Sequence, residues 1–246
     1  AAGVNILGKL KPENSLNEII KLAGDKRCIV RESVAEALSN FESEAVNFTL
    51  IRLLKDEISD VQKQAAISLF ESHPGKAIPV FKSLLKDEDL YIREEVAEIV
   101  GELRLEAAIP ELISLLKDKY GNVRYQAVEA LRILNAKSAI PELIPLLKDE
   151  CEEVATVSAI ALGKLQAEEA IPILAKLLKS NDMSMRGSAL QGLAQIKSEK
   201  AMIELNKLLQ NNKFIQLENG VYSAKALNLL GEIQTELGYY QPVTSK

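Results

Sequence analysis

Residues 108–116 read AIPELISLL, and nearly the same letters return 31 residues later, at 139–147, as AIPELIPLL. Shorter copies that begin Ala-Ile-Pro start at Ala77 and Ala170, again on the same interval. A fixed interval of this length is typical of repeat proteins, in which each repeat is one small unit of secondary structure. We therefore interpret the chain as an array of repeats before assigning any single element.

Two apolar series keep the same interval along most of the chain. Each supplies one side chain per repeat, as expected for a buried position that recurs in every unit. The first series is Val30, Val61, Ile92, Val123, Val154 and Met185, and the second is Leu38, Leu69, Val100, Leu131, Leu162 and Leu193.

Each repeat is predicted to be a hairpin of two α-helices. In residues 108–117 the apolar side chains are spaced to cover one face of a helix, and Pro110 lies where a first helical turn tolerates proline. A second helix is expected over about residues 122–134. A row of lysines, one near the end of each first helix, is explained by the helix dipole, with a basic binding edge as the alternative. This row is Lys55, Lys86, Lys117, Lys148 and Lys179.

A single hairpin buries only one face of each helix, so the repeats must be stabilised by stacking on one another. The expected fold class is therefore all-α, an α-α solenoid of about seven full repeats preceded by a half repeat and forming one domain over residues 1–246. The expected full repeats are 15–45, 46–76, 77–107, 108–138, 139–169, 170–200 and 201–238.

Both ends depart from the regular pattern. Residues 7–10 match residues 162–165, so residues 1–10 are expected to form the second helix of an incomplete repeat. Because terminal repeats normally carry a polar cap, we expect the chain to be a piece of a longer protein, with a lone capping helix as the alternative. Near the other end, Phe214, Ile215 and Leu217 are expected to cap the stack or, alternatively, to contact a partner.

Composition excludes several classes of function. A net charge of −5 and the absence of Trp disfavour a nucleic-acid-binding surface. One His and two Cys are too few for most zinc, haem or iron–sulfur sites, so no metal, cofactor or catalytic residue is expected. His73 precedes a Pro-Gly turn and is expected to be a solvated loop residue. No apolar run is long enough to span a membrane, and a cytoplasmic location is expected.

The pattern A-I-P-x-L-x-x-L-L-K-D, followed by V-R-x-x-A-x-x-A-L-x-x-L, resembles the HEAT repeat, particularly the HEAT-like repeats of the phycobilin-lyase type. The resemblance implies a right-handed superhelix whose second helices line a concave side. It also implies a ladder of Asp and Arg side chains that holds successive repeats in line. The ladder pairs are Asp25 with Arg31, Asp87 with Arg93 and Asp118 with Arg124. The ladder lapses at Gln62 and Ala155, where a softer stack is expected.

The predicted second helix of the third repeat carries Glu94, Glu95, Glu98 and Glu102 on its variable positions. Like charges one turn apart each cost a few tenths of a kcal/mol, and no Lys lies on that stripe to offset them. The stripe is interpreted either as a solvated face or as a surface that meets a basic segment of a partner.

In the fourth and fifth repeats the corresponding positions include Tyr125, Glu129, Ile133, Val157 and Ile160. The four apolar members replace residues that are Glu or Gln elsewhere. They are interpreted either as exposed anchors for a partner or as side chains buried by a different packing between repeats.

The predicted function is a non-catalytic scaffold, monomeric in isolation, that binds a protein or peptide on its second helices. The alternative is a phycobilin-lyase-like protein or a tetrapyrrole-binding chaperone, which lacks support from any cluster of Arg, His and Tyr. A third possibility, recognition of damaged DNA, is disfavoured by the acidic stripe and the lack of Trp.

Overall fold

The computed structural model describes residues 3–4, 8 and 15–209. Among these residues every regular element is a helix, and none is a strand. The chain divides into two compact units, Ala1–Leu112 and Ile113–Lys246, which are described one at a time. The predicted all-α fold class is confirmed, whereas the prediction of a single domain stays a prediction.

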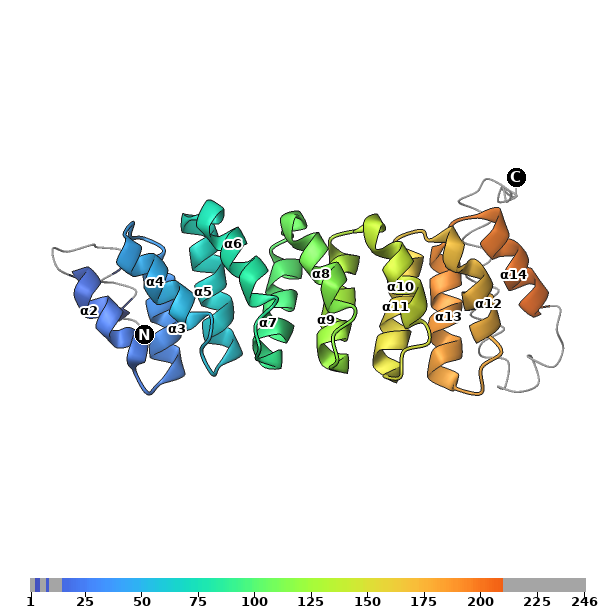
Figure 1. Cartoon of the computed structure of the whole chain (residues 1–246), viewed down its shortest axis with the longest axis horizontal. Coiled ribbons are helices and arrows are strands. Elements are labelled where there is room, and N and C mark those ends of the chain that lie inside the picture. The colour runs from blue at the N-terminus through green and yellow to red at the C-terminus, as the bar shows by residue number, and fades with distance from the viewer. Residues whose placement is uncertain (1–2, 5–7, 9–14, 210–246) are drawn as a thin grey trace, which may run out of the picture. The chain divides into compact units, whose positions relative to one another are not determined.

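The first unit consists of helical hairpins, visible from α2 to α7 in Figure 1. Helix α5 packs against α3, α4 and α6, and α6 packs against α7. The elements are α2 (Ser15–Lys21), the 3₁₀ turn η1 (Leu22–Gly24), α3 (Cys28–Leu38), α4 (Glu44–Leu53), α5 (Ser59–Ser72), α6 (Pro74–Leu84), α7 (Leu90–Glu102) and the 3₁₀ turn η2 (Glu106–Ala108). Helix α8 (Ile109–Leu115) contains the boundary between the units.

The second unit repeats the same hairpin, with α11 packed between α9 and α13. Its elements are α9 (Gly121–Ile133), η3 (Lys137–Ala139), α10 (Ile140–Leu146), α11 (Glu152–Lys164), η4 (Glu168–Ala170), α12 (Ile171–Leu177), α13 (Met183–Gln195) and α14 (Glu199–Leu209). The predicted second helix of the last repeat lies outside the described residues, as do Phe214, Ile215 and Leu217.

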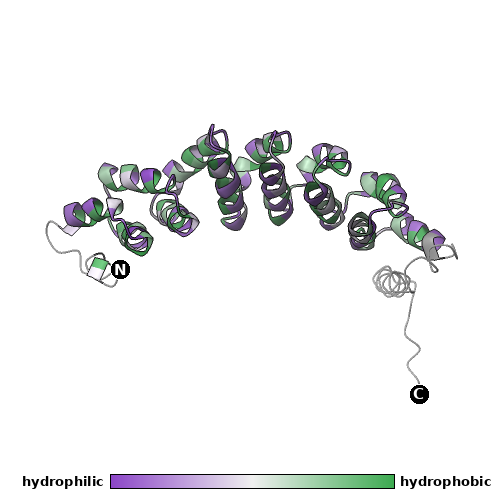
Figure 2. Cartoon of the chain, turned by 90° about the horizontal axis from the view of Figure 1, so that it is seen from below, coloured by the Kyte–Doolittle hydropathy of each residue, from purple (hydrophilic) through white to green (hydrophobic). Residues whose placement is uncertain are grey.

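The apolar series found in the sequence form the cores of the two units. Every member of the series from Leu38 to Leu193 has no exposed surface, and every member of the series from Val30 to Met185 is buried. Figure 2 shows hydrophobic and hydrophilic residues on the same helices, as expected when each helix buries one face. The predicted hairpin and its 31-residue interval are therefore confirmed over the described repeats.

Three of the second helices end in the same backbone turn. Arg104, Asn135 and Gln166 have φ values of 53°, 51° and 60°, in the left-handed region. In each turn the next residue donates its N–H to a carbonyl five positions earlier, as Leu105 does to Val100 at 3.0 Å. This is the Schellman arrangement, which satisfies the last carbonyls of a helix and redirects the chain into the next repeat.

The start of the first helix was predicted wrongly in one repeat. Pro79 lies inside α6, which begins at Pro74, rather than in its first turn. In the next three repeats a 3₁₀ turn precedes the helix, whereas here Pro74 itself supplies a fixed φ suited to the first helical position. His73 also differs from the prediction, because it is half-buried between α5 and α6 and its Nδ1 atom is enclosed.

The described part of residues 1–10 agrees with the predicted half repeat. Gly3, Val4 and Gly8 are helical, and a Cβ on Gly8 would lie 2.7 Å from the Cβ of Ala37. Gly163 makes the equivalent contact with Gly192, which like Ala37 lies 29 residues further along the chain. A Cβ on Gly163 would lie 2.6 Å from the Gly192 carbonyl oxygen. The two contacts show that Gly8 occupies the place of a second-helix glycine against the first full repeat.

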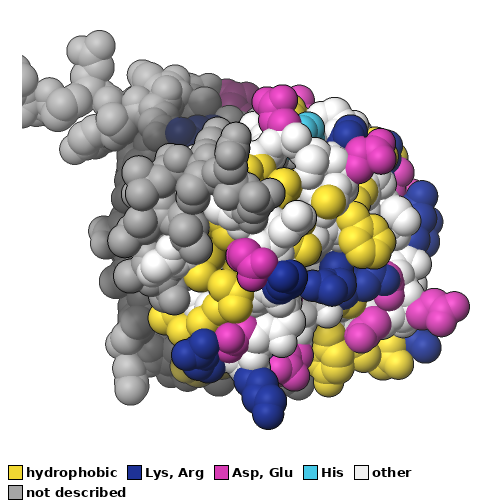
Figure 3. Space-filling view, turned by 90° about the vertical axis from the view of Figure 1, so that its left-hand side faces the viewer, with side chains coloured by type: hydrophobic (Ala, Val, Ile, Leu, Met, Phe, Trp, Pro, Cys, Tyr) yellow, Lys and Arg dark blue, Asp and Glu magenta, His cyan; other side chains and the backbone are white. Residues whose placement is uncertain are grey.

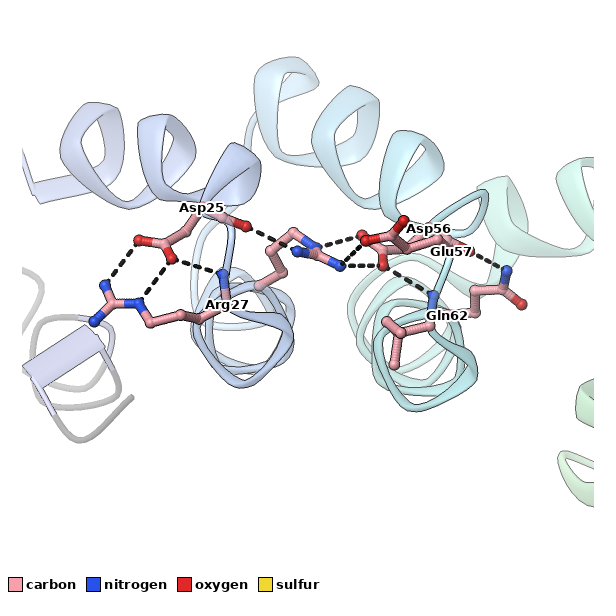
Figure 4. Close-up of polar contacts among 7 residues, drawn as sticks. Asp25, Arg27, Asp56, Glu57 and Gln62 are labelled. Carbon is pink, nitrogen blue, oxygen red and sulfur yellow. Dashed lines mark hydrogen bonds and ion pairs between the residues drawn. The ribbon is translucent and has the colours of Figure 1, made fainter.

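The Asp–Arg ladder is present, and Arg31 and Arg124 each join two successive repeats. Figure 4 shows the polar contacts around Asp25 and Asp56. Arg31 donates to the backbone carbonyl of Asp25 at 2.8 Å and to both carboxylate oxygens of Asp56 at 2.7 and 2.8 Å. Arg124 likewise bonds the Asp118 carbonyl and the Asp149 carboxylate. The carboxylate partner therefore belongs to the following repeat, and such charge-assisted, forked bonds fix the loops in line.

The two lapses of the ladder are bridged by other contacts. Gln62 reaches only the backbone carbonyl of Asp56, and Lys55 takes over the carboxylate of Asp87 at 2.6 Å. At Ala155 no side chain replaces Arg, but α11 and α13 approach closely, since a Cβ on Gly192 would lie 2.5 Å from the Ala159 oxygen. That backbone contact opposes the softening predicted at this position.

The lysine row also acts between repeats. Lys55 pairs with Asp87, Lys86 lies 3.6 Å from Glu111, and Lys117 lies 3.0 Å from Glu142. For these three lysines an acidic side chain of the following repeat is the partner, so they do not form an unpaired basic edge.

Candidate functional site

The predicted acidic stripe lies on α7 in the first unit. Glu94, Glu95 and Glu98 are half-buried, and Glu102 is exposed. Lys63 on α5 bonds the Glu98 carboxylate at 2.8 Å and lies 3.9 Å from that of Glu95, while Ser59 donates to Glu95 at 2.6 Å. No Lys lies on the stripe itself, as the sequence shows, but Lys63 of the preceding repeat partly offsets its charge.

The contact between Lys63 and the stripe follows from the geometry of the repeats. Lys63 and Glu98 are one repeat plus one helical turn apart, so their helices bring them together although no Lys lies on α7 itself. The bond to Glu98 raises the pKa of Lys63 above its ordinary value. Lys63 partly neutralises the charge of the stripe. The interpretation of the stripe as a docking surface for a basic partner is therefore weakened.

The first unit presents both signs of charge elsewhere as well. In Figure 3, which views the end of the molecule that lies on the left in Figure 1, basic and acidic side chains are mixed with hydrophobic ones. A mixture of this kind favours a solvated surface over a steering field.

A cleft lies on the second helices of the second unit, with a volume of about 410 Å³. Tyr125 and Glu129 come from α9, and Ser184 comes from the first turn of α13. Helix α11 supplies the remaining lining: Glu152, Glu153, Thr156, Val157 and Ile160. The structure thus brings together four of the residues predicted in this region, namely Tyr125, Glu129, Val157 and Ile160.

The apolar residues of the cleft differ in exposure. Tyr125 is 37% exposed and Ile160 is half-buried, so both offer surface to a partner. Val157 is only 4% exposed, so of its two interpretations the structure supports burial and not an exposed anchor. Ser33 and Ser188, at the same position of other repeats, are buried too, so the position faces a neighbouring helix. Ile133 is half-buried and does not line the cleft.

The rim of the cleft is acidic. Glu152 and Glu153 are exposed in the first turn of α11, where the positive end of the helix dipole stabilises carboxylates. The Cys151 thiol donates to Glu153 at 3.0 Å and holds the pKa of that carboxyl below its ordinary value. Glu129 is bonded by Arg132, whose Nε lies 3.1 Å from Oε2.

Sequence reasoning missed Glu152, Glu153, Thr156 and Ser184 as members of this site. The available signal was the helical spacing, since Glu153 and Thr156 precede Val157 and Ile160 by one turn. The Thr156 hydroxyl has no hydrogen-bond partner among the described residues and is enclosed beside the cleft.

Other chemistry has little support in the described part of the chain. No group of three or more His, Cys, Asp and Glu side chains there could hold a metal ion. No helix within the described ranges has the length and apolar character needed to cross a bilayer. Cys28 and Cys151 are free cysteines.

A second cleft of about 460 Å³ lies beside α12 and α14, away from the predicted residues. It is lined by Ile171, Pro172, Ala175, Lys200, Ile203 and Glu204.

Comparison with known proteins agrees with this helical-repeat architecture. The model of HEAT repeats matches residues 47–132 and 140–217, about two thirds of the chain, and the model of the PBS lyase HEAT-like repeat matches residues 123–149. The chain therefore belongs to the HEAT-repeat family. No curated protein matches its sequence.

Several solved structures are similar to the chain. YibA of Escherichia coli is 21% identical with a TM-score of 0.60, covering 93% of this chain and 85% of that one. An engineered protein is 23% identical with a TM-score of 0.50, covering 89% and 68%. The complex of CpcE and CpcF of phycocyanin lyase from a Nostoc species is 23% identical with a TM-score of 0.45, covering 90% and 96%. At these identities the first two support the fold alone.

Proposed function

We propose that this chain is a non-catalytic scaffold that binds a protein or peptide on the second helices of its second unit. The observation that carries the proposal is the cleft beside α9, α11 and α13, where Tyr125 and Ile160 remain accessible. Aromatic and aliphatic side chains of this kind, rimmed by charged residues, are typical anchors of protein interfaces.

The lining of the cleft supports a binding role rather than a reaction. It contains three carboxylates, three hydroxyls and two aliphatic side chains, and it includes no His, Lys or Cys. Arg132 bonds Glu129 and the Cys151 thiol bonds Glu153, while Glu152 lies in the first turn of α11, where the helix dipole stabilises it.

Affinity capture from native extract, with mass spectrometry of the retained proteins, tests the proposal when wild type and variants are compared. We expect a protein held by wild type to be lost from a Tyr125→Ala/Ile160→Ser double variant. Phe48→Ala is the matched control, because Phe48 on α4 is 71% exposed and lies in the first unit. If all three forms retain the same proteins in equal amounts, the cleft is not the binding site.

A second candidate, tetrapyrrole binding, is favoured by the match of residues 123–149 to the phycobilin-lyase type of repeat, which includes most of α9. The exposed carboxylates of Glu152 and Glu153 oppose it, since they repel the propionate groups of a bilin. Mixing the chain with a bilin and recording the absorption spectrum distinguishes the two. We expect an unchanged spectrum, and a shifted and intensified band would favour the second candidate.

A further inference from the structure

We infer that the cleft selects a peptide segment in which one apolar side chain is flanked by Lys or Arg. This inference deepens the proposed function and rests on it. The apolar side chain would contact Tyr125 and Ile160, and the basic side chains would meet Glu152 and Glu153 at the rim.

The charges of the lining residues carry the first step. Three of them are carboxylates, at Glu129, Glu152 and Glu153, and the lining contains no Lys or Arg. Arg132 offsets the charge of Glu129 through bonds from its Nε and Nη2 atoms. Glu152 and Glu153 therefore supply the charge that faces a ligand, and the Cys151 thiol favours the ionised form of Glu153.

Glu152 and Glu153 lie at the N-terminus of α11, where the helix dipole opposes their negative charge. A helix N-terminus carries a partial positive charge of roughly half a unit, which would repel a cation. Two carboxylates in that first turn outweigh it, so the potential at the rim is negative. A pair of adjacent carboxylates also offers several acceptor oxygens, which suits the planar guanidinium of Arg or the ammonium of Lys.

The apolar part of the cleft sets the size of the anchor. Val157 lies buried below the surface, while Tyr125 and Ile160 are accessible. A volume of about 410 Å³ lies toward the small end of ligand sites, which span roughly 300–1,000 Å³. One large side chain with its flanking backbone fits a site of this size better than a whole helix does.

Three short fluorescent peptides test the inference by anisotropy with the full chain. One peptide has a Phe between pairs of Lys, the second replaces each Lys by Glu, and the third keeps Lys but replaces Phe by Ser. We expect the first to bind at least about tenfold more tightly than either of the others. Its affinity should fall as salt is raised, because the charges at the rim are exposed.

The variants separate charge from apolar contact. Glu152→Lys/Glu153→Lys should weaken the Phe–Lys peptide by about tenfold or more, because it reverses the rim. The control is Glu168→Lys/Glu169→Lys, an adjacent exposed pair in the same unit that does not line the cleft and changes net charge equally. Circular dichroism and the thermal midpoint establish that each variant is folded.

The outcomes distinguish the inference from the function on which it rests. Equal binding of the Lys and Glu peptides, both lost in Ile160→Ser, would overturn the charge selection and leave the cleft as a docking site. Failure of all three peptides to bind would overturn the inference, whereas the affinity capture with the Tyr125→Ala/Ile160→Ser variant decides the function on which it rests. Sedimentation velocity measures self-association, and a dimer that dissociates in Ile160→Ser would assign the cleft to a second copy of the chain and contradict the inference.

Discussion

Arg124 connects two successive repeats through one guanidinium group. Its side chain and that of Asp149 are 8% and 6% exposed, so their bonds are partly shielded from water. Asp149→Asn keeps the shape of the side chain but removes the charge, and we expect it to lower the free energy of unfolding by about 1.5–3 kcal/mol. Urea unfolding followed by circular dichroism measures the loss.

Glu150 provides the control for this substitution. It lies next to Asp149 and within 3.7 Å of Arg124, but its side chain is 86% exposed. Glu150→Gln should therefore change stability by less than about 0.5 kcal/mol. Equal effects of the two substitutions would show that Arg124 does not join the repeats as described.

Lys55 makes the stability of the first unit depend on pH. Its bond to Asp87 lowers the pKa of that carboxyl, with smaller contributions from neighbouring groups. A lowered pKa in the folded state stabilises the protein above the ordinary Asp value of about 3.9 and loses that contribution as pH falls through the folded value.

We therefore expect Lys55→Met to raise the pKa of Asp87 toward its ordinary value. Wild type should be more stable than the variant at neutral pH, and the difference should shrink below about pH 4. An NMR titration of the Asp87 carboxyl, together with unfolding at several pH values, measures both effects. An unaltered Asp87 titration in Lys55→Met would contradict the assignment.

Two residues with the same left-handed backbone are expected to respond oppositely to glycine. Arg104 is exposed, so Arg104→Gly removes the steric cost of a positive φ and should stabilise the protein by about 0.5–1 kcal/mol. Gln166 donates to the Gln195 carbonyl at 2.5 Å and accepts from the Lys197 N–H at 2.9 Å. Because these bonds join two repeats, Gln166→Gly should destabilise the protein by about 1 kcal/mol.

Thermal unfolding of both variants measures the two signs. Stabilisation by Gln166→Gly as large as that by Arg104→Gly would show that the bonds of Gln166 contribute nothing.

At the scale of the helix, the contact between α11 and α13 is set by glycine. A Cβ on Gly192 would lie 2.5 Å from the Ala159 carbonyl oxygen, a backbone atom that cannot rotate away. Gly192→Ala should therefore separate the two helices and cost about 1–3 kcal/mol, in spite of the better helix propensity of Ala.

Gly75 is the matched control, since it lies in α6 and a Cβ there would meet no atom within 4 Å. Gly75→Ala should stabilise the protein by about 0.5–1 kcal/mol. Calorimetry of both variants compares the signs, and stabilisation of both would rule out a close contact at Gly192.

The helices themselves could be predicted from the sequence, because each repeat gives the same apolar pattern again. Buried positions such as Leu131 recur without exception over the described repeats, and the expected second helix at 122–134 lies within one residue of α9. The start of α6 could not be predicted from the Ala-Ile-Pro motif, because the helix begins at Pro74, five residues before the proline of the motif, Pro79.

Contacts between repeats were predicted less well than the helices. Lys63 meets Glu98, and Arg31 meets Asp56, at separations that combine the repeat interval with a helical or turn offset. Such pairs cannot be predicted from the sequence of a single helix, because their two residues belong to different repeats. For the same reason the sequence left open whether Val157 is exposed or buried, and the structure shows that its position faces the neighbouring helix.

At the scale of the whole molecule, the repeats specify the family but not the partner. The same hairpin recurs in both units, whereas the accessible Tyr125 and Ile160, with their acidic rim, belong to one cleft in the second unit. Function in repeat proteins depends on such local departures from the repeat, because the recurring positions are occupied by packing.

Hydrogen–deuterium exchange of the full chain, with and without the Phe–Lys peptide, tests the location of the binding site most directly. Binding at the cleft predicts slower exchange in α9 and α11, together with the first turn of α13, and unchanged exchange in α4 to α6. Protection confined to the first unit, or to α12 and α14, would contradict the account.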